Sequence, residues 1–330
     1  YEEMITVEII NVENFMPKDN EVDDFRSEVK GVLKYCSSAS SFLERYPPVR
    51  SKRNFVRCCS SLCDQTFQVV DKPLSGSLQA QIFRYFRISD QYQSYLSLLL
   101  KSREFYLAYP SYRQHTSGLF PIIELPKTRE GKPFIPSETG QRSEHEFSLS
   151  HQYPYIGIAR IKGNCIGFDI VILEDLHKNM TEIDYIRSFQ HSFGESEWDS
   201  ITTSKSKSRE FLLRWCMKES YTKAIGLGLS LNFQSFIIRL QGAPRYWWEY
   251  VFESGCKEGY HKTLGATICH AKNEKRGNED CLFSFIPIFS ESNVIRGCAS
   301  ICIPVAEKGN DIQLNISCLN VDDLINSHGK

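Results

Sequence analysis

The stretch WCMKESYTKAIGLG, residues 215–228, has the composition of a helix that ends on a glycine. Trp215, Glu219 and Lys223 are spaced four residues apart, so they lie in one row on the helix surface. The ordinary explanation of such a row is an exposed ion pair beside a tryptophan of the core. The same row would also suit a helix that presents a carboxylate and an ammonium group to a ligand, and the rest of the chain must distinguish the two.

The overall composition is that of a soluble globular protein. The chain has 330 residues, which suits about two domains. Its formal net charge of −1 argues against bulk electrostatic binding of nucleic acid or of an anionic membrane. No run approaches the roughly 18 apolar residues of a membrane helix, and no secretory signal is recognisable. We therefore expect a cytoplasmic protein that binds neither nucleic acid nor membranes.

Twelve cysteines are present, and their arrangement is more informative than their number. Cys58, Cys59 and Cys63 cluster, but no pair of C-x-x-C knuckles occurs and no histidine follows at zinc-finger spacing. Cysteine also packs well as a small buried residue. We expect reduced and mostly buried thiols, with a zinc- or nucleic-acid-binding protein as a remote alternative.

The first half of the chain mixes strand and helix patterns. EMITVEIINV, near the N-terminus, predicts a strand because it is rich in β-branched residues. Residues 81–108 carry apolar residues at helical spacing, with Tyr92, Tyr95, Leu96, Leu99 and Leu100 in one buried stripe. The segment 121–136, PIIELPKTREGKPFIP, predicts a strand, a basic turn and a short strand.

The second half begins with strands joined by tight turns. EFSLSHQYPYIGIARIKGNCIGFDIVIL, from Glu146, predicts three strands, and Gly163-Asn164 is a strong turn signal. His151 is then expected just past the first of these strands, and Asp169 on the third. The fold class that follows from this mixture of hairpins and helices is α+β.

Helices and further strands are expected beyond this point. The patterns predict helices over 182–201 and 210–225, the second ended by Gly226 or Gly228, with an exposed loop at 202–208. Further strands are predicted in SLNFQSFIIRL, WWEYVF, CLFSFIPIF and GCASICIPV.

Asp169 and Glu219 together suggest a site for a cation. A carboxylate on a buried strand is costly unless a cation or a hydrogen-bond donor compensates it. Carboxylates from a strand and from a helix can share one Mg²⁺, which prefers oxygen ligands and retains waters. Lysines nearby, such as Lys223, would then favour a pyrophosphate ligand and phosphoryl-type transfer.

Five motifs in this order resemble the 4′-phosphopantetheinyl transferases, and especially the Sfp-type enzymes that activate aminoadipate-semialdehyde dehydrogenase and acyl carrier proteins. The resemblance covers about residues 120–240. It is carried by GKP (131–133), FSLSHQ (147–152), IGFDI (166–170), FGESEW (193–198) and WCMKESYTKAIGLGL (215–229).

The resemblance implies a pseudo-twofold pair of α/β subdomains with coenzyme A between them. We place the subdomains at 1–165, with an extra Cys/Ser-rich segment near 21–80, and at 166–330. The implied reaction transfers the phosphopantetheine arm of coenzyme A to a serine of an apo acyl carrier protein or carrier domain and releases 3′,5′-ADP. The resemblance also implies a monomer.

The same resemblance assigns roles to individual residues. Asp169 and Glu219 would hold Mg²⁺, and Glu219 could also accept the serine proton. Lys223 would stabilise charge on the phosphates. The coenzyme A contacts it implies are Ser150, His151, Lys132 and Lys223.

Two positions depart from the family pattern. Many members carry a second acid where this chain has Val171, and many carry an arginine near residue 98, where this chain has Leu98. Arg87 or Lys101 could replace that arginine. Because of these departures, a carrier-domain-binding protein without catalytic turnover stays open as the alternative.

Overall fold

The computed structural model describes residues 3–17, 21–26, 37–38, 74–110, 122–137, 139–172, 180–252, 260–270, 278–290, 292, 294–305 and 312–318. Cys58, Cys59, Cys63 and most of the segment near 21–80 lie outside these ranges. The elements of the first half are β1 (Glu3–Asn11), η1 (Glu13–Phe15), β2 (Ser37–Ser38), α3 (Leu74–Phe83), α4 (Ile88–Ala108), β3 (Ile123–Glu124), β4 (His145–Gln152) and β5 (Tyr155–Lys162).

The second half holds most of the helices. Its elements are β6 (Gly167–Ile172), α5 (Glu182–Ser188), η5 (Gln190–Ser192), α6 (Glu195–Thr203), α7 (Lys207–Ala224), η6 (Gly228–Ser230), η7 (Phe233–Ser235), β7 (Phe236–Leu240), α8 (Trp247–Phe252), β8 (Lys262–His270), β9 (Glu279–Phe289), β10 (Ile295–Pro304) and β11 (Ile312–Cys318). Helices and largely antiparallel strands in one chain confirm the predicted α+β class.

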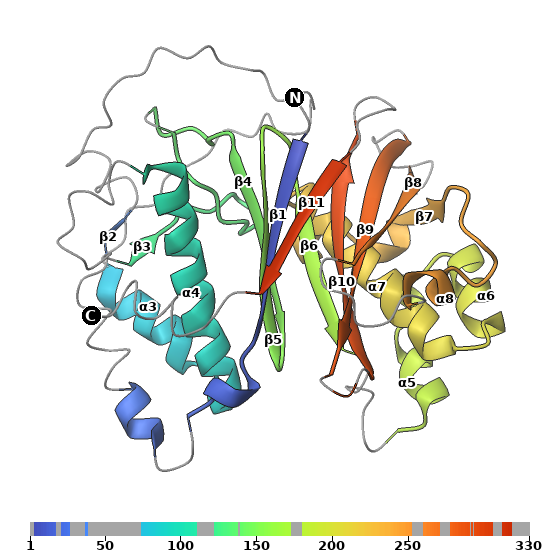
Figure 1. Ribbon diagram of the computed structural model, residues 1–330, viewed down its shortest axis with the longest axis horizontal. Helices are drawn as coiled ribbons and strands as arrows, with labels where there is room; N and C mark the ends of the chain where they lie inside the picture. The colour runs from blue at the N-terminus through green and yellow to red at the C-terminus, as the bar shows by residue number, and fades with distance from the viewer. Residues whose placement is uncertain are drawn as a thin grey trace.

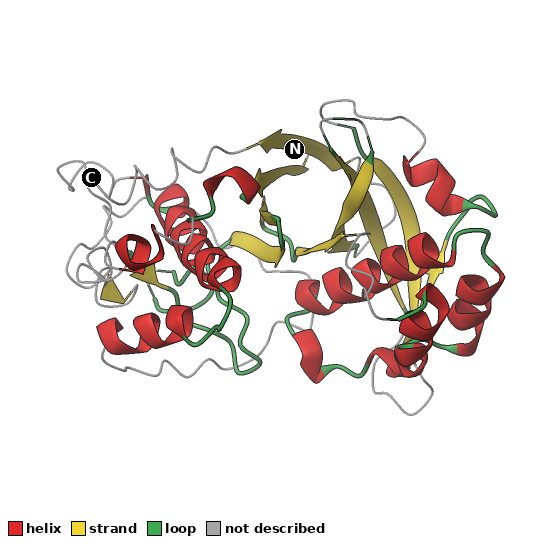
Figure 2. Ribbon diagram, turned by 90° about the horizontal axis from the view of Figure 1, so that it is seen from below, coloured by secondary structure: helices red, strands yellow, loops and turns green. Residues whose placement is uncertain are grey.

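Two sheets form the centre of the molecule. One has the strand order β11-β1-β5-β4 and the other the order β6-β10-β9-β8-β7, and β2 pairs with β3 separately. Figure 1 shows the two sheets side by side, with α3 and α4 on one outer side and α5 to α8 on the other. The view from below in Figure 2 shows the same order of helices, strands and helices.

The chain ends tie the two halves together. The pairing of β1 with β11 is parallel, and it brings a strand from the end of the chain into the first sheet. Every neighbouring pair in the second sheet is antiparallel. The division at residue 165 stays a prediction.

Three apolar clusters fill the layers. One packs α4 against the first sheet, one packs α7 against the second sheet, and the third lies between the sheets. The predicted stripe of α4 is confirmed, because all of its members are buried: Tyr92, Tyr95, Leu96, Leu99 and Leu100. Burial of such side chains stabilises the fold by roughly 25 cal/mol per Å² of apolar surface removed from water.

Most predicted strands are confirmed, and several local predictions are wrong. The segment WWEYVF forms α8 rather than a strand, because a short apolar run fits a buried helix as well as a strand. His151 lies within β4 and not beyond it. The helical pattern of 81–108 also divides into α3 and α4, which are separated by residues 84–87.

The described cysteines are free thiols, and most of them are buried, as predicted. They are Cys165, Cys216, Cys269, Cys281, Cys298 and Cys302. Among the described residues, no three His, Cys, Asp or Glu side chains gather as a metal-ion site. None of the helices in the described ranges has the length and apolar character needed to cross a membrane.

Candidate active site

The motif FSLSHQ is strand β4, and its alternation serves two purposes. One face carries Phe147, Leu149 and His151, which line a pocket. The opposite face points to β6, where side-chain oxygens accept hydrogen bonds from backbone N–H groups. These bonds run from Phe168 N to Ser148 Oγ (2.9 Å), from Ile170 N to Ser150 Oγ (3.3 Å) and from Ile172 N to Gln152 Oε1 (2.9 Å). We call this contact between the two sheets the seam.

The motif IGFDI forms β6, which lies beneath α7. A Cβ on Gly167 would stand 1.7 Å from the carbonyl oxygen of Ser220, so only glycine allows the helix to approach this closely. The thiol of Cys216 donates to the carbonyl oxygen of Asp169 at 3.4 Å. These contacts hold α7 close against the backbone of β6 at Gly167 and Asp169.

The end of α7 is built by Gly226, one of the two glycines predicted to end it. Gly226 has a φ of 79°, and its N–H donates to the carbonyl of Lys223 at 3.2 Å. The N–H of Leu227 donates to the carbonyl of Thr222 at 3.0 Å, which completes a Schellman motif. Lys132 of the GKP turn donates to the carbonyl of Ala224 at 3.4 Å and so caps the negative end of the helix.

The carboxylate of Asp169 receives two donors at one oxygen. Lys223 Nζ and Ser150 Oγ each lie 2.7 Å from Asp169 Oδ1, and Lys223 Nζ also donates to Ser150 Oγ at 3.0 Å. Asp169 is 6% exposed, so it is a buried charge compensated by an ammonium and a hydroxyl. No described side chain donates to Oδ2, which leaves that oxygen available to a cation.

Glu219 lies next to this group on α7. Burial and the negative charge of Asp169 raise the pKa of Glu219 to about 7, and Lys223 opposes the shift. The two carboxylates repel each other in a poorly solvated place. The arrangement therefore favours either a proton or a metal cation at Glu219, and a carboxyl group with this pKa can exchange a proton near neutral pH.

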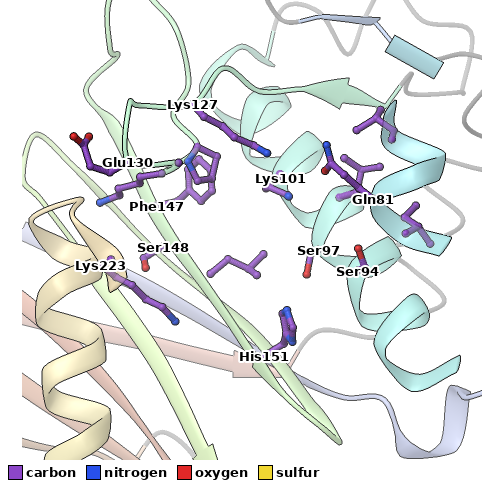
Figure 3. Close-up of a pocket in the computed structure, with 18 of the residues that line it drawn as sticks. Gln81, Ser94, Ser97, Lys101, Lys127, Glu130, Phe147, Ser148, His151 and Lys223 are labelled. Atoms are coloured by element: carbon purple, nitrogen blue, oxygen red, sulfur yellow. The ribbon is translucent and has the colours of Figure 1, made fainter. Parts of the chain in front are cut away.

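A pocket of about 390 Å³ adjoins these residues. It lies between α4, the GKP turn, β4 and the end of α7, and Figure 3 shows side chains from these elements pointing into it. Among the described residues of its wall, the charged ones are Arg84, Lys101, Lys127, Lys132 and Lys223 against the single carboxylate of Glu130. Its charge and size suit a ligand with several phosphate groups.

Most of the predicted ligand-binding residues meet at this pocket. His151, Lys132 and Lys223 line it, and Ser150 contacts Lys223 behind the wall. Burial and the charge of Lys223 lower the pKa of His151, so its imidazole is neutral at pH 7. Arg87 differs from the others, because it is exposed at the N-cap of α4 and is not among the lining residues.

The two departures from the family pattern have different surroundings. Val171 is 4% exposed and packs in the cluster beneath α7. Leu98 lines the pocket, and Lys101 lines it three residues later on the same helix face. A cation is thus present in this wall, one turn beyond the position expected for an arginine.

The sequence motifs also contain a pair of residues to which we assigned no role. Lys218 is completely buried, and its ammonium donates to the carbonyls of Phe233 (2.8 Å) and Phe236 (2.7 Å). Glu197, from FGESEW, lies 3.0 Å from the same ammonium and accepts from the backbone of Gly194 at 3.0 Å. Lys218 precedes Glu219 on α7, so this buried pair restrains the rotation of the helix that carries Glu219.

Comparison with known proteins supports the predicted family. Residues 165–269 match the model of the 4′-phosphopantetheinyl transferase superfamily. This part of the chain is a 4′-phosphopantetheinyl transferase superfamily domain. It contains Asp169, Glu219 and Lys223, whereas the GKP turn and FSLSHQ lie ahead of it.

The relatives of the superfamily domain include enzymes from animals and bacteria. The chain is 35% identical over 118 residues to the L-aminoadipate-semialdehyde dehydrogenase-phosphopantetheinyl transferase of Xenopus laevis, covering 34% of this chain and 38% of that protein. It is 28% identical over 193 residues to the 4′-phosphopantetheinyl transferase gsp of Aneurinibacillus migulanus, covering 56% and 69%. The chain is also 29% identical over 173 residues to the L-aminoadipate-semialdehyde dehydrogenase-phosphopantetheinyl transferase of Schizosaccharomyces pombe, covering 49% of this chain and 62% of that protein. The match thus spans under half of the animal relative's length.

Proposed function

We propose that this protein transfers the 4′-phosphopantetheine arm of coenzyme A to a serine of an apo acyl carrier protein or carrier domain. The observation that carries the proposal is the pair of carboxylates, Asp169 and Glu219, in the superfamily domain. They lie beside Lys223, which lines a cationic pocket. The names of the relatives support the same reaction type.

Mg²⁺ fits the donor set of this site. Asp169 and Glu219 are two hard oxygen donors, and Mg²⁺ is commonly bound by one or two carboxylates together with waters and substrate phosphates. Two carboxylates without a third protein ligand agree with that pattern, and Val171 leaves the remaining positions to water or to the ligand. The metal would neutralise negative charge on the pyrophosphate.

The proposed transfer is a displacement at phosphorus. The carrier serine oxygen forms a bond to the phosphorus on the pantetheine side, the pyrophosphate P–O bond breaks, and 3′,5′-ADP leaves with the bonding electrons. Glu219 takes the serine proton directly or through a water, which a carboxylate with a pKa of about 7 can do at neutral pH.

Lys223 would stabilise the negative charge that develops on the leaving phosphate. Its ammonium is held in place by Asp169 and Ser150, so little reorganisation is needed when a phosphate binds. His151 and Lys132 lie in the same wall and would contact the nucleotide part of coenzyme A.

The remaining features of the proposal follow from the family resemblance. We propose a pseudo-twofold pair of subdomains divided near residue 165, each built of a sheet and a long helix. We also propose that the protein is a monomer in the cytoplasm. Its macromolecular partners are carrier domains, and it binds neither nucleic acid nor membranes.

The test is the intact mass of an apo acyl carrier protein incubated with the protein, coenzyme A and Mg²⁺. A gain of one phosphopantetheine group that disappears when Mg²⁺ is chelated would support the proposal. Binding of coenzyme A without any transfer to several carriers would instead support a carrier-binding protein without turnover. If coenzyme A did not bind at all, both functions would be excluded.

A further inference from the structure

Ser150 is a buried hydroxyl of β4 to which the reaction above gives no role of its own. The residue is 6% exposed and is not among those that line the pocket, although Leu149 and His151 on either side of it are. Neighbouring side chains of a strand point to opposite faces, which accounts for this difference. The hydroxyl of Ser150 therefore faces the seam and the carboxylate of Asp169 instead of the pocket.

The hydrogen bonds of Ser150 use the whole capacity of its hydroxyl. A serine hydroxyl has one proton to donate and two lone pairs that accept. Ser150 donates its proton to Asp169 Oδ1 at 2.7 Å, and it accepts from Lys223 Nζ at 3.0 Å and from Ile170 N at 3.3 Å. A phosphate of a ligand accepts hydrogen bonds, so Ser150 could donate to it only by releasing Asp169.

The same contacts determine how the carboxylate of Asp169 is presented. Its Oδ1 accepts from Lys223 Nζ as well as from Ser150, and no described side chain donates to Oδ2. The two donors come from different elements, β4 and α7, so the carboxylate is held from two directions. Hydrogen bonds of this kind orient metal ligands in proteins generally, because a carboxylate that is fixed at one oxygen keeps the other oxygen in a defined direction.

We propose that Ser150 is a positioning residue for the metal site. Its hydroxyl fixes the rotation of the Asp169 carboxylate, so that Oδ1 stays paired with Lys223 and Oδ2 is free to bind a divalent cation. This role replaces the coenzyme A contact that the family resemblance implies for Ser150. The inference rests on the proposed function, because the cation belongs to the proposed transfer.

Ser148 provides a matched control two residues earlier on the same strand. Its hydroxyl accepts from Phe168 N at 2.9 Å, which is the counterpart of the seam bond from Ile170 N to Ser150. Among the described residues, the hydrogen bond to the Asp169 carboxylate comes from Ser150 and not from Ser148. Ser148→Ala and Ser150→Ala thus each remove one acceptor from the seam, and only Ser150→Ala removes a partner of Asp169.

The experiment measures Mn²⁺ binding by electron paramagnetic resonance, because the sharp signal of the free ion is lost on binding. Mn²⁺ is suited to the same carboxylate and water ligands as Mg²⁺. The full chain is titrated with Mn²⁺ in the presence of coenzyme A and without a carrier protein, so no transfer occurs. Binding of coenzyme A is measured separately by calorimetry in EDTA, and urea unfolding gives the stability of each variant.

We expect Ser150→Ala to weaken Mn²⁺ binding about 10- to 100-fold, which is the usual effect of removing a hydrogen-bond partner of a metal ligand. Its affinity for coenzyme A in EDTA should change less than about threefold. Ser148→Ala should lose similar stability but keep its Mn²⁺ affinity within about twofold. Ser150→Cys has a weaker donor of similar shape, so it should weaken Mn²⁺ binding at least about threefold and serves as the second variant if Ser150→Ala does not fold.

Three results would overturn the positioning role alone. Unchanged Mn²⁺ binding in the Ser150 variants would mean that Asp169 does not depend on this hydroxyl. An equal loss of Mn²⁺ affinity in Ser148→Ala would make the seam responsible instead. A loss of coenzyme A affinity of about tenfold or more in EDTA would assign the hydroxyl of Ser150 to the ligand. Failure of the wild type to bind coenzyme A would overturn the proposed function as well.

Discussion

Replacement of Lys218 by methionine tests how the site is held in place. Lys218→Met keeps an apolar stem of similar length but removes the ammonium that contacts two carbonyls and Glu197. Glu197 is 2% exposed, so its charge would be left buried without its cation. Breaking such a pair from one side costs about 3–5 kcal/mol, which corresponds to about two to four powers of ten in the unfolding equilibrium.

The measurement is urea unfolding followed by tryptophan fluorescence. The four tryptophans of the chain are Trp198, Trp215, Trp247 and Trp248, so the signal reports on the region that contains Lys218. The comparison needs Glu197→Gln and the double variant, because the two residues share one interaction. The double variant should lose less stability than the sum of the single variants.

Two results would refute this reasoning. A loss below about 1 kcal/mol in Lys218→Met would mean that water or a rearranged helix compensates the buried carboxylate. Strictly additive losses would mean that Lys218 and Glu197 do not depend on each other. Lys162→Met, at an exposed position, should stay within about 0.5 kcal/mol of the wild type.

Three further variants test the site itself. Glu219→Gln is nearly isosteric and should lower the rate of transfer at least about 100-fold without unfolding the protein, because a positioned base contributes at least that factor. Retained turnover would remove Glu219 from the mechanism. Asp169→Ala removes the partner of Lys223 and should lower both the rate and the response to Mg²⁺, and an unchanged magnesium titration would argue against Asp169 as a ligand. Gly167→Ala places a Cβ 1.7 Å from the carbonyl oxygen of Ser220 and should lower the free energy of unfolding in urea by about 3 kcal/mol or more. Wild-type stability of this variant would contradict the close approach of α7 to β6.

The sequence predicted the elements that carry the site because their signals are local. The turn at Gly163-Asn164 and the end of α7 at Gly226 both depend on a glycine with positive φ. The types of the neighbouring residues predict such glycine positions. The row of Glu219 and Lys223 follows from the helical repeat alone. Local patterns of this kind placed Asp169 on a strand and Glu219 on a helix.

Other features could not be predicted because they depend on distant residues. WWEYVF was expected to be a strand but forms α8. The helix packs on β9, for example through Trp247 against Phe285, and this partner is distant in the sequence. The ion pair of Lys218 with Glu197 spans 21 residues and has no periodic signal. The parallel pairing of β1 with β11 joins the two ends of the chain, and no local pattern selects that partner.

The most informative motif, FSLSHQ, shows why site and fold are difficult to separate in this protein. β6 pairs with β10 along one edge, and along the other edge its N–H groups are satisfied by side chains of β4. Ser150 accepts a hydrogen bond from Ile170 in this seam and also donates to Asp169, so one hydroxyl serves the joint between the sheets and the candidate site. An unpaired N–H in the buried seam would cost about 1–3 kcal/mol. Selection for a stable joint would therefore retain Ser150 even without catalysis, and the presence of this serine is weaker evidence for function than the carboxylates of Asp169 and Glu219.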